Sequence, residues 1–167
     1  MHILIATDAT WLVDDIVAAL GTDDTTFTVC RDGRAVAGQV AERTPDLCIL
    51  DLQVGSMGGM AVTMSLRLDE SAGTLPRVPI LMLLDRAADL HLARRSAADG
   101  WLIKPIDSLR LKRAADTVAA GGTYTEGLGA DAAAVQPMVD LGDSERSAAD
   151  ETTAAATSPE GDPVNAG

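Results

Sequence analysis

Two acidic side chains and one lysine each follow an apolar run of the sequence, and the three together could carry out phosphoryl chemistry. The runs are residues 47–50, 2–6 and 100–103, and they lead in that order to Asp51, Asp8 and Lys104. Carboxylate oxygens suit a divalent cation such as Mg²⁺, and an ammonium group suits a phosphoryl oxygen. A magnesium and phosphoryl site is expected wherever these three side chains meet.

Short apolar runs of this kind are typical of strands that are buried on both faces of a parallel sheet. Two more strands are predicted at residues 26–30 and 79–84. Apolar residues at helical spacing predict helices at residues 10–20, 35–43, 60–68, 87–98 and 108–120. This alternation predicts an α/β fold with helices on both faces of the sheet. In such folds the carboxyl ends of the strands form the edge where ligands bind, and both aspartates and the lysine belong to that edge.

The ordered set Asp8, Asp51 and Lys104-Pro105 resembles the receiver domain of bacterial two-component response regulators over residues 1–120. The resemblance implies a flavodoxin-like receiver fold, which is a doubly wound parallel sheet of five strands in the order 2-1-3-4-5. It also implies a phosphorelay signalling protein that works by protein contact. A receiver is not an enzyme in the usual sense, although it can catalyse its own phosphoryl transfer and dephosphorylation.

The resemblance assigns a role to each residue at the predicted edge. Asp51 would accept a phosphoryl group from a histidine kinase or a phosphotransfer protein, and Lys104 would contact that group. Asp8 and Asp51, with the backbone carbonyl of Gln53, would hold Mg²⁺. The peptide bond before Pro105 would be cis, as suits an X-Pro bond in a tight functional turn.

Several positions depart from the pattern of the family. Receivers carry two adjacent acids after the first strand, and here the first of the pair is Thr7. The fourth strand of a receiver ends in Thr or Ser, and here it ends in Leu84. Gly55 and Gly58 replace a frequent Pro and Asp, whereas the aromatic switch position of the last strand is kept as Trp101. The chain is therefore an atypical receiver at its switch positions.

The missing hydroxyl at Leu84 has an energetic consequence. A hydrogen bond to a charged group contributes about 1.5–3 kcal/mol, whereas reversing a 1:99 equilibrium requires about 5.5 kcal/mol. A third to a half of the usual switching energy could be lost while the chemistry of Asp51 survives. Two alternatives to a working receiver follow: a pseudo-receiver that binds proteins without phosphorylation, and a small metal-dependent enzyme that transfers phosphate to a diffusible substrate.

Three further positions allow two interpretations each. Trp11 is expected to pack inward, with contact to a kinase as the alternative, because receivers dock the kinase at this helix. Asp85 is expected to cap the next helix, with a third acid near the metal as the alternative. The stripe formed by Met60, Met64 and Leu68 is expected in the core, with a binding surface as the alternative.

The negative charge of the chain is concentrated after residue 120. The formal net charge is −12, and residues 121–167 hold nine acidic residues against Arg146 alone. This segment is rich in Ala, Gly, Ser, Thr and Pro, so we expect a disordered tail in which residues 135–141 make at most a transient contact. No DNA-binding output domain is expected there, and a chain without a basic stripe is not expected to bind nucleic acid directly. The downstream protein partner is unknown.

Cysteine content and hydropathy indicate the compartment. Cys30 and Cys48 lie in or at the end of apolar runs without metal-ligand spacing, so reduced buried thiols are expected. The N-terminus begins directly with a predicted strand, and no apolar run reaches the ~18 residues of a membrane span. A cytoplasmic protein without a membrane partner is expected.

Overall fold

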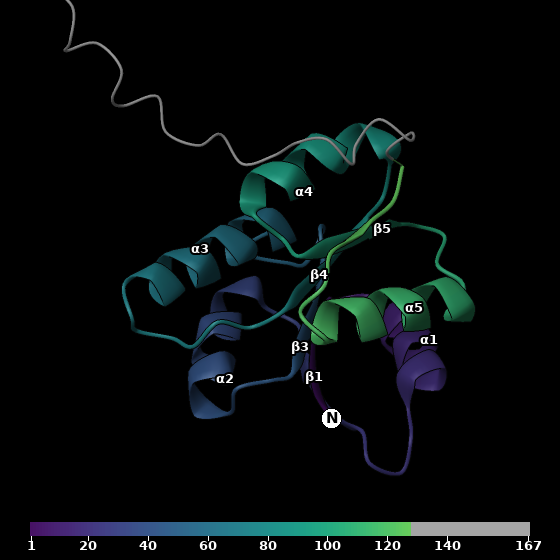
Figure 1. Ribbon diagram of the computed structural model, residues 1–167, viewed down its shortest axis with the longest axis horizontal. Helices are drawn as coiled ribbons and strands as arrows, with labels where there is room; N and C mark the ends of the chain where they lie inside the picture. Colours follow the sequence, from purple (N-terminus) through teal and green to yellow (C-terminus); the bar gives the residue numbers. More distant parts are fainter. Residues whose placement is uncertain (128–167) are drawn as a thin grey trace, which may run out of the picture. The chain divides into compact units, whose positions relative to one another are not determined.

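Six parallel strands form one sheet in the order β2-β1-β3-β4-β5-β6 in the computed structural model, which describes residues 1–127 (Figure 1). The strands are β1 (His2–Ala6), β2 (Thr26–Cys30), β3 (Leu47–Asp51), β4 (Ile80–Leu84), β5 (Gly100–Ile103) and β6 (Tyr124–Thr125). The predicted order of the first five strands is confirmed. The two-residue strand β6 was not predicted, and it pairs in parallel with β5 after the helix that follows β5.

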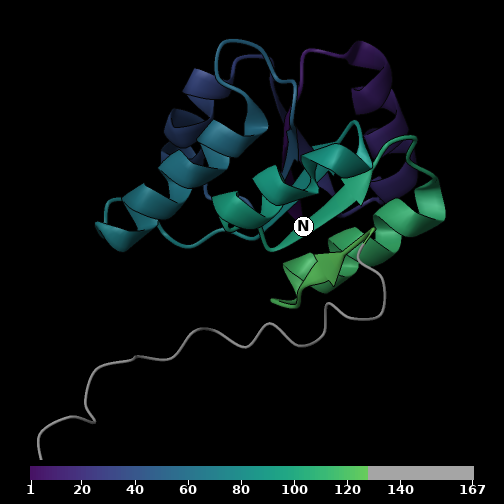
Figure 2. The same cartoon turned by 90° about the horizontal axis from the view of Figure 1, so that it is seen from above.

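Five α-helices connect the strands and cover both faces of the sheet. They are α1 (Thr10–Leu20), α2 (Val36–Glu42), α3 (Gly59–Ser71), α4 (Leu90–Ser96) and α5 (Ser108–Ala119). Helices α1 and α5 lie side by side on one face, and α2 and α3 lie on the other (Figures 1 and 2). Short 3₁₀ turns, Gly33–Ala35 and Ala87–Asp89, precede α2 and α4, so both of these helices are shorter than predicted.

The apolar core lies on both faces of the sheet, as the unbroken apolar strands require. Every residue of β1, β3 and β4 is buried, because helices cover both faces of these central strands. One apolar cluster joins the sheet to α1 and α5, and a second joins it to α2 and α3. A third cluster packs α4 against the ends of β4 and β5, which places it next to the carboxyl edge of the sheet.

The helices α1 and α5 begin in different ways. Thr10 is the first residue of α1, and Ala9 precedes it without a side-chain cap. Gly21 follows the end of α1. At the start of α5 the side chain of Asp107 caps the helix by accepting a hydrogen bond of 2.9 Å from the backbone N–H of Arg110.

Two expectations about apolar side chains were wrong. Trp11, expected to pack inward, is 58% exposed at the start of α1. In the predicted core stripe of α3, Met60 is partly buried against the third apolar cluster, as expected, but Met64 is 49% exposed and Leu68 is 69% exposed. Because α3 turns its other side toward the sheet, Val62 and Leu66 are the residues that pack into the core.

The folded part of the chain continues past the predicted boundary at residue 120. Residues 121–127 lie beside β5 and include β6. This strand is parallel to β5, with Gly100 in register with Tyr124. A side chain at Gly100 would lie only 2.8 Å from the carbonyl oxygen of Tyr124, so this close approach requires a glycine. The predicted disorder of the remaining tail and the predicted contact of residues 135–141 lie outside the described residues.

Both cysteines are buried free thiols, in agreement with the expected reduced state. Burial raises the pKa of the Cys48 thiol to about 12, against a smaller lowering by the charge of Arg67. In residues 1–127, no helix has both the length and the hydropathy needed to cross a membrane.

Candidate functional site

Asp51 lies at the centre of the carboxyl edge of the sheet. It is the last residue of β3, the third strand in the sheet order, and only 3% of it is exposed. The next helix starts very close to it, since a side chain at Gly59 would lie 2.5 Å from the carbonyl oxygen of Asp51. The buried strand and this tight connection fix the direction of the carboxylate, which must find polar partners because burying an unpaired charge is costly.

Lys104 is the charged partner of this carboxylate. Its Nζ donates to Asp51 Oδ1 at 2.7 Å, across the 53 residues that separate them in the sequence. Lys104 follows β5, two strands away, and the peptide bond to Pro105 is cis as predicted. Burial disfavours the ammonium ion, but the hydrogen bonds and charges of Asp51 and Asp85 outweigh it, so the pKa of Lys104 is raised.

Thr7, which replaces an acid of the family pattern, is a direct partner of Asp51. Its fully buried hydroxyl donates to Asp51 Oδ2 at 2.8 Å and accepts a hydrogen bond of 3.2 Å from the backbone N–H of Ala9. The sequence indicated only the loss of a carboxylate at this position. The structure shows that the loss is accompanied by a gain, because the hydroxyl supplies a hydrogen bond to the charged group.

The two oxygens of Asp51 differ in their remaining capacity for ligands. Oδ1 accepts from Lys104 and also from the backbone N–H of Gln53, at 3.2 Å. Oδ2 accepts from Thr7 alone within residues 1–127. A carboxylate offers about four lone-pair positions in total, so Oδ2 keeps one lone pair available for a further ligand.

The residues expected to hold Mg²⁺ supply ligand types that suit this ion. Asp8 is exposed beside the loop after β3, because a side chain at Gly55 would lie 3.6 Å from Asp8 Oδ2. Across residues 1–127, no cluster of three or more Asp, Glu, His or Cys side chains is arranged to hold a metal. Mg²⁺ is, however, commonly bound by one or two carboxylates together with waters and phosphate oxygens. The carboxylates of Asp8 and Asp51, with the carbonyl of Gln53, fit that smaller set.

Asp85 belongs to the site, although it was expected to cap the next helix. The expected helix cap was wrong, because the turn that starts at Ala87 is preceded by Arg86 and has no side-chain cap. Asp85 Oδ1 instead accepts from Lys104 Nζ at 2.9 Å, and its side chain is 33% exposed. Lys104 therefore bridges two carboxylates, one buried and one partly open to solvent.

The two predicted switch positions lie together in the third apolar cluster. Leu84 is fully buried at the end of β4, and Trp101 in β5 is 5% exposed. The indole of Trp101 lies inside the domain, and its Nε1 donates to the carbonyl oxygen of Glu126 at 2.9 Å. The position of the missing hydroxyl is therefore filled by apolar packing.

A second polar group of this region, formed by Arg110 and Glu126, was missed by the sequence analysis. Arg110 Nε donates to Glu126 Oε1 at 2.8 Å, and a second guanidinium nitrogen contacts Glu126 Oε2. Glu126 lies in the segment that was expected to be disordered, so its acidic side chain had been counted with the tail. The neighbouring strand residues, Tyr124 and Thr125, are too few to show a strand pattern in the sequence.

Most of the described chain matches a known protein family. The family model of the response regulator receiver domain matches residues 3–116. A DNA-binding response regulator MtrA of Mycolicibacterium paratuberculosis is 32% identical over 106 residues, which cover 62% of this chain and 44% of that protein. The chain therefore spans less than half the length of the curated relatives it matches.

Solved structures show the same fold. A response regulator from Chloroflexus aurantiacus superimposes with a TM-score of 0.64 at 21% identity, covering 71% of this chain and 97% of that one. The receiver domain of a sensor histidine kinase from Pseudomonas aeruginosa has a TM-score of 0.60 at 21% identity, with 71% and 97% covered. That structure is described as having a magnesium ion coordinated in its active site cleft.

Proposed function

The chain belongs to the response regulator receiver domains of two-component systems, and on that premise we propose that Asp51 accepts a phosphoryl group from a histidine kinase or phosphotransfer protein. The observation that carries the proposal is the contact of 2.7 Å between Lys104 Nζ and a 97% buried Asp51 at the carboxyl edge of the sheet. A buried nucleophile with an ammonium ion at its side suits the transfer of a negatively charged group.

The proposed transfer uses the oxygen of Asp51 that has spare capacity. A lone pair of Oδ2 attacks the phosphorus atom of a phosphohistidine, a P–O bond forms, and the P–N bond breaks with the electron pair returning to the imidazole of the donor. Lys104 stays within reach of the phosphoryl oxygens and offsets their charge, while Asp85 keeps its ammonium group oriented. Asp8, Asp51 and the carbonyl of Gln53 would hold Mg²⁺, which would supply further charge neutralisation when bound.

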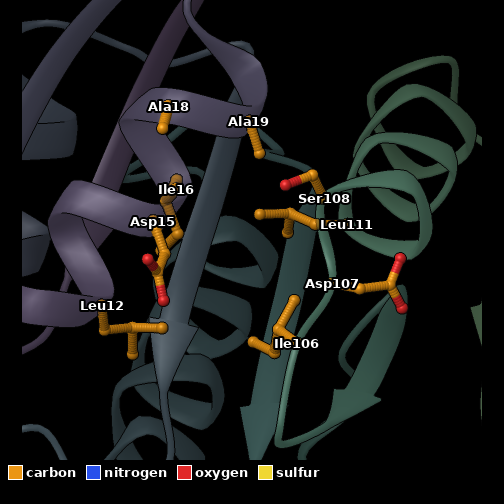
Figure 3. A pocket seen from close by; sticks show the side chains of 9 residues that line it. All are labelled: Leu12, Asp15, Ile16, Ala18, Ala19, Ile106, Asp107, Ser108 and Leu111. Carbon is orange, nitrogen blue, oxygen red and sulfur yellow. The ribbon is translucent and has the colours of Figure 1, made fainter.

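The donor protein is proposed to dock on α1 and the start of α5. A groove of about 260 Å³ lies between these elements, with residues of α1 on one side and residues 106–111 on the other (Figure 3). Two large apolar side chains, Trp11 and Leu109, stand exposed at the starts of the two helices, at 58% and 61%. An exposed Trp is a favourable anchor for an amphipathic helix of a partner, and the groove offers that helix both apolar and acidic side chains, among them Leu12 and Asp15.

A pseudo-receiver is the second candidate, and one observation favours it. Leu84 fills the switch position with buried apolar packing, so a phosphoryl group on Asp51 would find no hydroxyl there to draw the β4 end inward. Under this alternative the domain binds its protein partner in one conformation. The two candidates differ in whether Asp51 takes up phosphate at all.

Phosphotransfer from a labelled histidine phosphotransfer protein tests the proposal and its docking surface. We expect label to appear on the wild type and not on Asp51→Asn. Trp11→Ala should slow transfer from the protein donor about tenfold or more, since truncation of a buried anchor commonly costs 2 kcal/mol. The same variant should leave labelling by a small phosphodonor unchanged. Full labelling of Asp51→Asn would contradict the assignment of the acceptor, and equal rates for Trp11→Ala would contradict the docking surface.

A further inference from the structure

The backbone around Lys104 is bonded to β4 on one side, where the N–H of Lys104 donates to the carbonyl oxygen of Leu84 at 2.8 Å, and to an ion pair on the other side. Arg110 in α5 donates to the carbonyl oxygen of Ile103 at 3.1 Å and to that of Pro105 at 3.0 Å. Glu126 accepts a hydrogen bond of 2.8 Å from the backbone N–H of Ile103. The backbone on both sides of Lys104 is therefore bonded to one or both members of this pair.

The two members also hold each other. The guanidinium of Arg110 meets the carboxylate of Glu126 through two nitrogens, which is the bidentate arrangement with the strongest directional preference. The side chains are 34% and 25% exposed, so the pair is only partly screened by solvent. The backbone carbonyl of Glu126 binds the Trp101 indole at 2.9 Å, and this contact keeps residue 126 beside β5.

Glu126 lies ten residues beyond the match to the receiver family, which ends at residue 116. Its contacts therefore lie outside the residues that the family model matches. They act on the residue next to Lys104, whose Nζ in turn bridges Asp51 and Asp85. A continuous chain of contacts therefore leads from Glu126, through the backbone of Ile103 and the side chain of Lys104, to the carboxylate of Asp51.

We propose that Glu126, with Arg110, is a positioning residue that fixes Lys104 against Asp51. The inference rests on the proposed function for its effect on phosphoryl transfer. The position of the Lys104 ammonium group can be measured without any phosphorylation. Loss of the carboxylate at Glu126 frees the backbone N–H of Ile103 and leaves Arg110 with the two carbonyls and the more distant carboxylate of Asp107, at 3.5 Å. The lysine then spends more time away from the aspartate.

The chain offers a direct measurement, because Lys104 and Lys112 are its only lysines. Lys112 is exposed on α5 and serves as an internal reference. The full chain is treated briefly with a water-soluble acylating reagent, and the labelling of the two lysines is compared by peptide mass spectrometry. In Glu126→Gln the ratio of Lys104 to Lys112 labelling is expected to rise at least ~3-fold through more frequent local opening. Thr125→Ala, an exposed neighbour in β6, is expected to leave the ratio unchanged.

A second variant and a second readout make the outcomes decisive. Arg110→Gln removes the opposite member of the pair and should raise the same labelling ratio. Fluorescence emission of Trp101, measured in a Trp11→Phe background so that it is the only tryptophan, shows whether β6 remains in place in each variant. An unchanged ratio in both folded variants would overturn the positioning role. The initial rate of labelling by a small phosphodonor should fall ~3-fold to 10-fold in Glu126→Gln, because modest misplacement of a catalytic group is costly. If neither the wild type nor the variants take up phosphate, that result counts against the proposed function alone. The ratio of Lys104 to Lys112 labelling still tests the positioning role of Glu126.

Discussion

The variant Lys104→Met is expected to lose about 3–5 kcal/mol of unfolding free energy at pH 7, the cost of removing one partner of a buried ion pair. Asp51 is 3% exposed and the Lys104 side chain 14% exposed, so the Asp51 carboxylate is poorly hydrated once the ammonium group is removed. Urea denaturation measures the effect as a lower midpoint at an unchanged m-value. Lys112→Met, at the exposed lysine, is the matched control and should stay within about 0.5 kcal/mol of the wild type.

The same pair predicts a pH dependence. The folded-state pKa of Lys104 is raised above its ordinary value of 10.5, against the effect of burial, by its bonds to Asp51 and Asp85. A raised pKa means that the folded state binds the proton more tightly. The stabilisation is therefore fully present below pH 10.5 and is lost as pH rises through the folded-state value. The unfolding free energies of the wild type and Lys104→Met should therefore converge as the pH rises through the folded-state pKa of Lys104. A difference that stays constant through this range would contradict the ion pair as its source.

The double variant Asp51→Asn/Lys104→Met separates the charge effect from lost packing. Removing both partners leaves no uncompensated buried charge, so most of the loss seen in Lys104→Met should be recovered. Asp85 can tolerate the change because its side chain is 33% exposed. If the loss of stability in the double variant equals the sum of the losses in the two single variants, the two groups do not interact.

Restoring the second acid of the receiver pattern, by Thr7→Asp, is expected to make stability depend on magnesium. Thr7 is fully buried, and its hydroxyl donates to Asp51 Oδ2. The substitution removes a hydrogen bond to a charged group, worth about 1.5–3 kcal/mol, and adds a like charge beside it. We expect a loss of about 3 kcal/mol or more without metal, and recovery of about 2.7 kcal/mol when Mg²⁺ is present at 100 times its dissociation constant.

The control for this prediction is Thr7→Val, which has a similar shape and adds no charge. It should lose only the hydrogen-bond contribution, about 1.5–3 kcal/mol, and should respond to Mg²⁺ no more than the wild type does. Thermal unfolding with and without the metal distinguishes the two variants. Equal magnesium responses in Thr7→Asp and Thr7→Val would show that position 7 does not contribute to the cation site.

Much of the fold followed from the sequence because its signals are local. Apolar runs at β1, β3 and β4 are unbroken where helices cover both faces, and the order of the first five strands follows from the receiver pattern. Strand β6 was missed because two residues, Tyr124 and Thr125, carry no periodicity that can be recognised. They pair with β5 because Gly100 leaves room for the close approach.

The site was predicted in its centre and missed at its periphery, for a physical reason. Asp51 and Lys104 are unusual polar residues at the ends of apolar strands, so their position indicates a partner. Asp85 precedes a helix, where an acid has a common local role as a cap, and only the three-dimensional structure shows that Lys104 binds it instead. Whether Trp11 points inward depends on the angle of α1 relative to the sheet, which helical spacing does not determine.

The intact mass of the purified chain after incubation with a small phosphodonor and Mg²⁺ tests the central claim, that Asp51 is a reactive phosphoacceptor. We expect a gain of one phosphoryl group in the wild type and none in Asp51→Asn. The gain should depend on the metal and should be reversed by mild base, as expected of an acyl phosphate. An equal gain in Asp51→Asn, or no gain with either a small donor or a phosphorylated histidine protein, would contradict it and leave the pseudo-receiver as the function of this domain.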